Sequence, residues 1–120
     1  PQMTALVARN VTYDRARCEA AARRGYMNAT DLADVLVRQG VAFRDAHARA
    51  GAVVRTALER NVEIEDLPAG VLRELLPEVS GDLKAELAVA AVLARRAALG
   101  GTSPERVRAE VARWQETLKR

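Results

Sequence analysis

Apolar residues recur along most of this chain at the three-and-four spacing of a helix face, and glycine, proline and asparagine interrupt the pattern at intervals. Residues 87–94 differ, because they are apolar on every side, which is typical of a helix buried by several neighbours. Two stripes stand out: Phe43, His47, Ala50, Val54, Ala57 and Leu58 in one helix, and Val107, Val111, Trp114 and Leu118 in another. The pattern predicts an all-α protein.

Residues that end or start helices divide the chain into five or six short helices. Gly25, Gly40, Asn61, Pro77 and Gly100-Gly101 each follow a helical segment as a C-terminal stop. The predicted helices cover 14–24 with Thr12 or Asp14 as N-cap, 28–39 with its cap within 28–30, 43–60, 67–75, a long helix from Ser80 or Asp82 to Leu99, and a last helix capped by Thr102 or Ser103 with Pro104 in its first turn.

Short connections between these helices predict a compact bundle built from helix-turn-helix units. We expect one domain over residues 1–120, in which residues 1–12 are either its first segment or the tail of a preceding helix. If that tail does not fold back, an apolar face stays open and we expect self-association or a large apolar patch. If it does fold back, it closes the core and gives a monomer.

Composition fits a globular, close-packed helical protein, with 49% apolar, 29% charged and only 3% aromatic residues. No apolar run approaches the roughly 20 residues that a membrane span needs, and no signal peptide is visible. The single cysteine, Cys18, allows no internal disulfide. These features predict a cytoplasmic protein without a membrane partner.

The net charge of +3 raises the question of nucleic-acid binding. The arginines are interleaved with acidic residues, as in Arg44-Asp45 and Glu59-Arg60, which is typical of a solvated helix face. No helix shows the exposed row of basic and amide side chains that a recognition helix requires. We therefore predict no nucleic-acid partner.

Candidate catalytic chemistry is sparse. His47 is the only histidine, and its place on the first stripe predicts a buried or half-buried imidazole bonded to a nearby carbonyl. One histidine and one cysteine cannot complete a metal site, and both serines, Ser80 and Ser103, fall at cap positions. We predict no catalytic residue, no metal and no cofactor.

Two further groups have a weak case for function. Gly100, Gly101 and Thr102 precede a helix and are candidates for holding an anionic substrate, although each also has a structural role as stop or cap. Asp31, Asp34 and Arg38 have the spacing of a surface charge ladder on one helix. The structural interpretation is favoured for both groups.

Two sequence motifs point to a family. Residues 29–47 read A-T-D-L-A-D-V-L-V-R-Q-G-V-A-F-R-D-A-H, and residues 100–107 read G-G-T-S-P-E-R-V. In this order and at this distance they resemble the C-terminal domain of argininosuccinate lyase, a member of the fumarase/aspartase superfamily; Ala42 stands where the family usually has a proline. The residues that carry the resemblance, which we interpret as structural, are Ala29, Thr30, Asp31, Leu32, Ala33, Gly40, Phe43, Arg44, His47, Gly100, Gly101, Thr102 and Pro104.

The resemblance implies a small helical domain of a tetrameric enzyme that splits argininosuccinate into arginine and fumarate in arginine biosynthesis. In that family the catalytic base is a serine on a G-S-S-x-M-P-x-K-x-N loop, which does not occur in this sequence and which we expect upstream of Pro1. The family's C-terminal domain packs near the active-site entrance and shifts when ligand binds.

Three hypotheses follow from the sequence. The chain is an accessory C-terminal domain of an argininosuccinate lyase, inactive alone, whose partner is the catalytic portion; or it is a stand-alone binding or regulatory module that binds another protein; or, ranked last, its helix-turn-helix geometry binds DNA. Sequence continuing upstream into the catalytic loop would distinguish the first two.

Overall fold

The computed structural model describes residues 2–119 and is helical throughout, with no strand in that range. Its elements are α1 (Gln2–Asn10), α2 (Arg15–Ala22), α3 (Ala29–Arg38), α4 (Phe43–Arg60), the short 3₁₀ helix η1 (Ile64–Asp66), α5 (Ala69–Leu75), α6 (Leu83–Leu87), α7 (Val89–Arg95) and α8 (Pro104–Leu118). The all-α prediction is confirmed, and the expected number of helices is exceeded because residues 2–10 form α1, a short 3₁₀ helix lies in the connection before α5, and the predicted helix over 82–99 is divided into α6 and α7.

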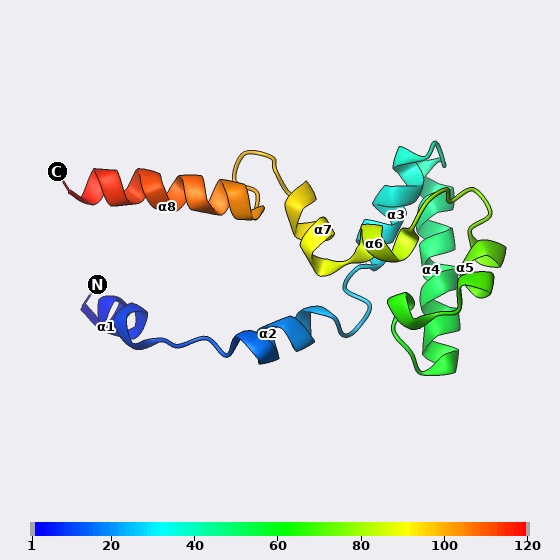
Figure 1. Ribbon diagram of the computed structural model, residues 1–120, viewed down its shortest axis with the longest axis horizontal. Helices are drawn as coiled ribbons and strands as arrows, with labels where there is room; N and C mark the ends of the chain where they lie inside the picture. Colours follow the sequence, from blue (N-terminus) through cyan, green and yellow to red (C-terminus); the bar gives the residue numbers. More distant parts are fainter. Residues whose placement is uncertain (1, 120) are drawn as a thin grey trace.

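The core lies where α3 and α4 pack against each other and against η1, α5 and α6 (Figure 1). Apolar residues at helical spacing on α3 meet small residues on α4, so the two backbones approach closely. The fully or nearly fully buried core residues are Leu32, Ala33, Val35, Leu36, Ala46, Ala50, Val53, Ala57, Ile64, Leu67, Leu72, Leu76, Leu83 and Leu87.

Helices α1, α2 and α8 extend from this core as two arms. None of the three has a buried residue, and both arms point to the same side of the molecule, so that α1 and the last turn of α8 lie at one end (Figure 1). The radius of gyration is 18.4 Å, whereas a compact chain of this length has about 14 Å. The compact bundle that the sequence predicts therefore describes α3–α7, and α1 does not fold back to close the core.

Most helix boundaries agree with the sequence prediction. Asp14 caps α2 by accepting a hydrogen bond from the Arg17 amide, and Asp82 caps α6 in the same way. Helix α4 ends at Asn61, which is left-handed with φ of 53°. At each of these helix ends the backbone conformation is one that the capping residue favours, so the local sequence is sufficient to predict where the helix begins or ends.

The predicted stripe on α4 is wrong in part. Phe43, His47 and Leu58 are exposed, whereas Ala50 and Ala57 are buried as predicted and Val54 is half-buried; Ala46 and Val53 complete the buried face. Because α4 packs closely on α3, alanines occupy the contact, and the larger residues lie one position around the helix. The imidazole of His47 is thus neither buried nor bonded to a carbonyl; its ring stacks on Phe43 with centroids 6.4 Å apart.

The predicted long helix over 82–99 is also wrong. It is broken at Ala88, where ψ is 137°, and helical structure ends at Arg95. The guanidinium of Arg95 donates to the Glu86 carbonyl (2.8 Å), a group that a continuous helix would have used internally. Within the segment 87–94 only Leu87 and Val92 are buried, so several neighbours do not cover it on all sides.

Candidate docking surface

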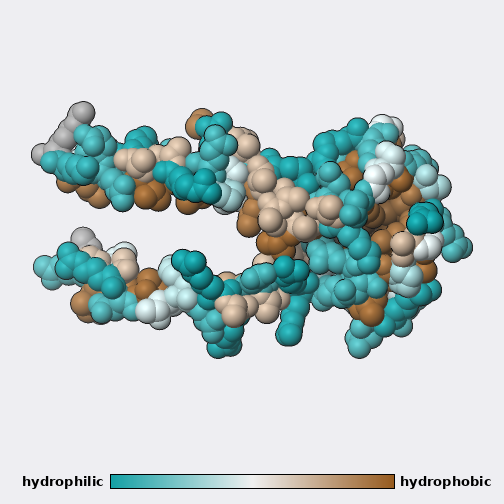
Figure 2. All heavy atoms as spheres, viewed as in Figure 1, coloured by the Kyte–Doolittle hydropathy of each residue, from teal (hydrophilic) through white to brown (hydrophobic). Residues whose placement is uncertain are grey.

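Helix α8 presents an uncovered apolar face, which consists of Val107, Val111, Trp114 and Leu118. The predicted stripe is present, but it does not contact the core: Trp114 is 52% and Leu118 is 80% exposed. Figure 2 shows apolar residues along the side of the α8 arm that borders the open space between the arms. A helix with this spacing normally buries its stripe against another element.

A hollow of about 500 Å³ runs along the α8 face. Apolar side chains line one side of it, and the turn before α8 closes one end. The lining residues are Leu99, Gly100, Gly101, Thr102, Arg106, Val107, Ala109, Glu110, Val111, Trp114, Gln115 and Leu118. The three weak substrate-binding candidates therefore lie at the end of an apolar surface.

The glycines of this turn each meet a backbone requirement. Gly100 is left-handed with φ of +77°, a conformation that favours glycine. At Gly101 an added Cβ would lie 2.1 Å from the Arg96 carbonyl oxygen and 2.8 Å from that of Ala98. The chain thus passes so close to the end of α7 that only glycine fits.

Two amides of the turn are hydrogen-bonded within the protein. The Gly101 amide donates to Ala98 O (2.8 Å), and the Ser103 amide donates to Arg96 O (3.1 Å). Ser103, which is buried, is the N-cap and accepts from the Arg106 amide, whereas Thr102 is exposed and makes no cap bond. This geometry supports a structural role for the turn rather than an anion cradle.

Helix α1 and the segment after it present a second apolar surface. Met3, Leu6 and Val7 are each more than half exposed, and Val11 and Tyr13 extend the surface toward α2. Since α1 and α8 lie on the same side of the molecule (Figure 1), one partner could contact both.

Contacts between residues far apart in the sequence fix the base of the α1–α2 arm to the core. The carboxylate of Glu63 accepts from the amides of Gly25 (3.1 Å) and Tyr26 (3.3 Å), and the Tyr26 hydroxyl donates to the Val62 carbonyl. Tyr26 is left-handed with φ of 56°, which is rare for a residue with a side chain. No local sequence signal indicates this clamp.

The predicted charge ladder on α3 does not form. Asp31 pairs with Arg96 at the end of α7 (3.5 Å), and Arg38 pairs with Glu86 on α6 (3.2 Å). These ion pairs with residues of other helices form in place of the predicted ion pairs within α3. Asp31, a residue of the first motif, thereby ties α3 to the base of the α8 arm.

The other motif residues fall into two groups. Leu32 and Ala33 belong to the core, and Gly40 is left-handed with φ of +92° between α3 and α4. Phe43, Arg44 and His47 are exposed on α4, and Thr30 is exposed at the start of α3. Ala29 is half-buried, and Pro104 begins α8.

Within residues 2–119, no group of three or more histidine, cysteine or acidic side chains is placed to hold a metal ion. No helix in the same range is both long and apolar enough to cross a bilayer. The feature that distinguishes the described residues is exposed apolar surface on the α1–α2 arm and on the α8 arm.

Comparison with known proteins identifies the family. Residues 26–94, which span α3 to α7 apart from its last residue, match the family described as argininosuccinate lyase C-terminal. The chain belongs to this family. The resemblance deduced from the two motifs is confirmed.

Whole proteins of the same name also match. The chain is 44% identical over 108 residues to argininosuccinate lyase of Halorhodospira halophila, covering 90% of this chain and 23% of that protein. It is 41% identical over 112 residues to argininosuccinate lyase of Dechloromonas aromatica, covering 93% of this chain and 24% of that protein. The chain spans about a quarter of the length of these curated relatives.

Both arms take part in this similarity. Because 108 of the 120 residues align with the first relative, at most 12 residues lie outside the alignment. The segments 1–25 and 95–120 are each longer than 12 residues, so the alignment includes part of both. The argininosuccinate lyase C-terminal family itself matches only residues 26–94, which form the core.

Proposed function

We propose that this chain acts as the accessory C-terminal part of an argininosuccinate lyase, without catalytic residues of its own. The observation that carries the proposal is its similarity at 44% identity, over 90% of the chain, to one quarter of a protein of that name. The chemistry is then the cleavage of argininosuccinate to arginine and fumarate, in arginine biosynthesis in the cytoplasm. The residues that perform it belong to the other three quarters.

The catalytic portion of the lyase is the partner that fits the two apolar arm surfaces. The α8 face carries a valine, a valine, a tryptophan and a leucine at intervals of four, three and four residues, which is the seam spacing of packed helices. Burying an aromatic anchor such as Trp114 typically dominates the energy of such an interface. Since the core is complete without α8, the face is free for a partner.

Attachment through both arms also accounts for their rigid bases. The Glu63 clamp holds the α2 arm, and the hydrogen bonds of the Gly100-Gly101 turn hold the α8 arm. An interface presented on fixed arms loses less conformational entropy on binding than one on loose segments. The clamp and the turn are therefore positioning elements for docking.

The test is complex formation with a truncated relative. The Halorhodospira halophila lyase without its matching quarter is co-expressed with this chain, and the complex is measured by sedimentation. Val111→Asp and Trp114→Asp place a charge in the α8 face, whereas Ala112→Asp makes a comparable change away from the stripe. We expect complex formation with wild type and Ala112→Asp, and at least about tenfold weaker binding with the other two, since truncation at an interface anchor costs 2 kcal/mol or more.

Failure of the wild-type chain to bind, while it is folded by circular dichroism, would contradict the proposal and favour a stand-alone module. Equal binding by all variants would show that docking does not use the α8 face.

A further inference from the structure

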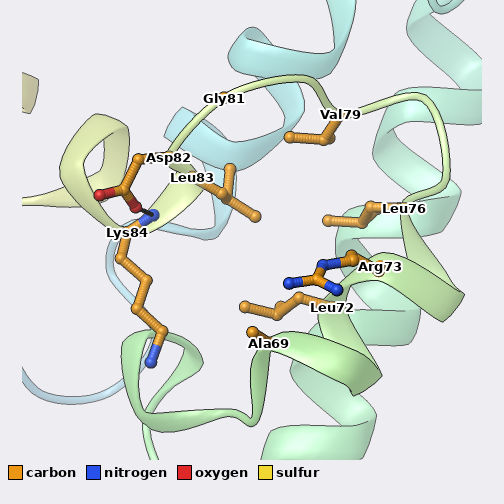
Figure 3. Close-up of a pocket in the computed structure, with 9 residues that line it drawn as sticks. All are labelled: Ala69, Leu72, Arg73, Leu76, Val79, Gly81, Asp82, Leu83 and Lys84. Atoms are coloured by element: carbon orange, nitrogen blue, oxygen red, sulfur yellow. Dashed lines mark hydrogen bonds between the residues drawn. The ribbon is translucent and has the colours of Figure 1, made fainter.

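A second hollow lies between α5 and the start of α6, on a part of the molecule distinct from the α8 face (Figure 3). Its volume of about 340 Å³ is in the lower range of small-molecule pockets. Leu72 and Arg73 of α5 line it together with Leu76 directly after that helix, and Val79, Asp82, Leu83 and Lys84 come from the connection and from α6.

The floor of this α5–α6 pocket is apolar and fixed. Leu72, Leu76 and Leu83 are at most 8% exposed and belong to the main core, so their positions are set by packing. Figure 3 shows the three leucine side chains directed into the space between the two helices. A ligand in the pocket would therefore meet a preformed apolar surface.

Two cationic side chains border that floor from different helices. Arg73 comes from α5 and Lys84 from α6, and within residues 2–119 neither side chain forms an ion pair or a hydrogen bond. In Figure 3 the Arg73 guanidinium lies between Leu72 and Leu76 and points toward α6. Arginines elsewhere in the chain, such as Arg49 and Arg95, are paired with carboxylates.

The one acidic residue of the lining does not neutralise this pair. The Asp82 carboxylate accepts hydrogen bonds from the backbone amides of Lys84 (3.0 Å) and Ala85 (3.2 Å) as the cap of α6. Figure 3 shows it directed away from Arg73. The pocket thus has two cationic groups that are unpaired within residues 2–119, an apolar floor, and one carboxylate whose hydrogen bonds are used to cap α6.

We propose that the α5–α6 pocket binds a small organic carboxylate with an apolar body. The guanidinium of Arg73 offers the planar pair of donors that matches a carboxylate, and Lys84 adds a mobile second charge. The leucine floor accepts the apolar part. This inference does not depend on the proposed function, because the pocket lies in the core and not on the arms.

The test uses the whole chain, with benzoate as the probe and benzyl alcohol as its uncharged counterpart. Amide chemical shifts are followed by NMR during each titration at constant ionic strength. We expect saturable shifts confined to residues 69–84 with benzoate, and weaker binding of benzyl alcohol. Replacing the two cations (Arg73→Gln with Lys84→Gln) should weaken benzoate binding about tenfold or more, while Arg60→Gln on α4 should leave it unchanged.

Scattered or unsaturable shifts in the wild-type chain would overturn the proposal. So would equal benzoate affinity of the wild type and the double variant. Arg73 and Lys84 are exposed, so the variants with a single substitution are expected to fold. If the double variant does not fold, the benzoate affinity of the single variants is compared with that of the wild type instead.

Discussion

Replacing Gly101 by alanine should loosen the base of the α8 arm. The added Cβ would lie 2.1 Å from the Arg96 carbonyl oxygen, so the backbone must move. That movement breaks or stretches two hydrogen bonds, from Gly101 N to Ala98 O and from Ser103 N to Arg96 O. At about 0.5–1.5 kcal/mol net for each bond, the expected cost is about 1–3 kcal/mol.

This cost should appear locally, since α8 has no buried residue and the core does not depend on it. The assay is amide hydrogen exchange of Ser103 and the first turn of α8, which reports local opening. We expect exchange about 5- to 150-fold faster in Gly101→Ala, with little change in the unfolding temperature of the core.

Gly70→Ala is the matched control. Gly70 lies within α5, has no left-handed φ, and an added Cβ there meets nothing within 4 Å. Because alanine favours a helix over glycine by about 0.5–1 kcal/mol, this change should be neutral or stabilising. If Ser103 exchanges equally fast in wild type and Gly101→Ala, the close approach does not hold the arm and the reasoning is refuted.

Four further predictions concern stability and activity. Leu32→Ala, at a fully buried core position, should lower the free energy of unfolding by about 2–5 kcal/mol in urea denaturation; a change below about 1 kcal/mol would contradict the core assignment. A hydrogen bond from Arg49 lowers the pKa of Glu78. The pair therefore stabilises the folded state above the ordinary pKa of 4.5, and this stabilisation is lost as pH falls through the lowered pKa. Arg49→Gln should raise the pKa of Glu78 in an NMR titration, and an unchanged pKa would argue against the pair. The purified chain should release no fumarate from argininosuccinate, and turnover above contaminant level would show a catalytic base of its own. At high concentration the chain should self-associate in sedimentation, less so with Val111→Asp or Trp114→Asp; a clean wild-type monomer would mean that the α8 face is not adhesive.

Local chemistry made much of the fold predictable. Gly40 follows the end of α3 and Asn61 the end of α4 as expected, and Asp82 and Ser103 cap the helices that follow them. The family resemblance is also confirmed, and the first motif, residues 29–47, lies within the matched range 26–94 and includes core positions such as Leu32. Capping residues and left-handed turn residues, whose role depends on local backbone conformation, are therefore the ones that the sequence identifies best.

Features set by tertiary contacts could not be predicted. A helix with alanine on several sides gives no unique buried face, so Phe43, His47 and Leu58 were wrongly assigned to the α4 core stripe although Ala50 and Ala57 were placed correctly. The break at Ala88 has no glycine or proline to signal it. The α8 stripe was correctly found, but its spacing is the same whether it packs on its own core or on a partner.

The central claim is that this chain supplies the C-terminal part of an argininosuccinate lyase. The most direct measurement replaces the matching quarter of the Halorhodospira halophila enzyme with this chain and follows fumarate release from argininosuccinate. We expect an active chimera whose activity is lost when Val111 and Trp114 are both changed to aspartate. A chimera that folds and assembles like the parent enzyme, yet has no activity with the wild-type segment, would contradict the claim.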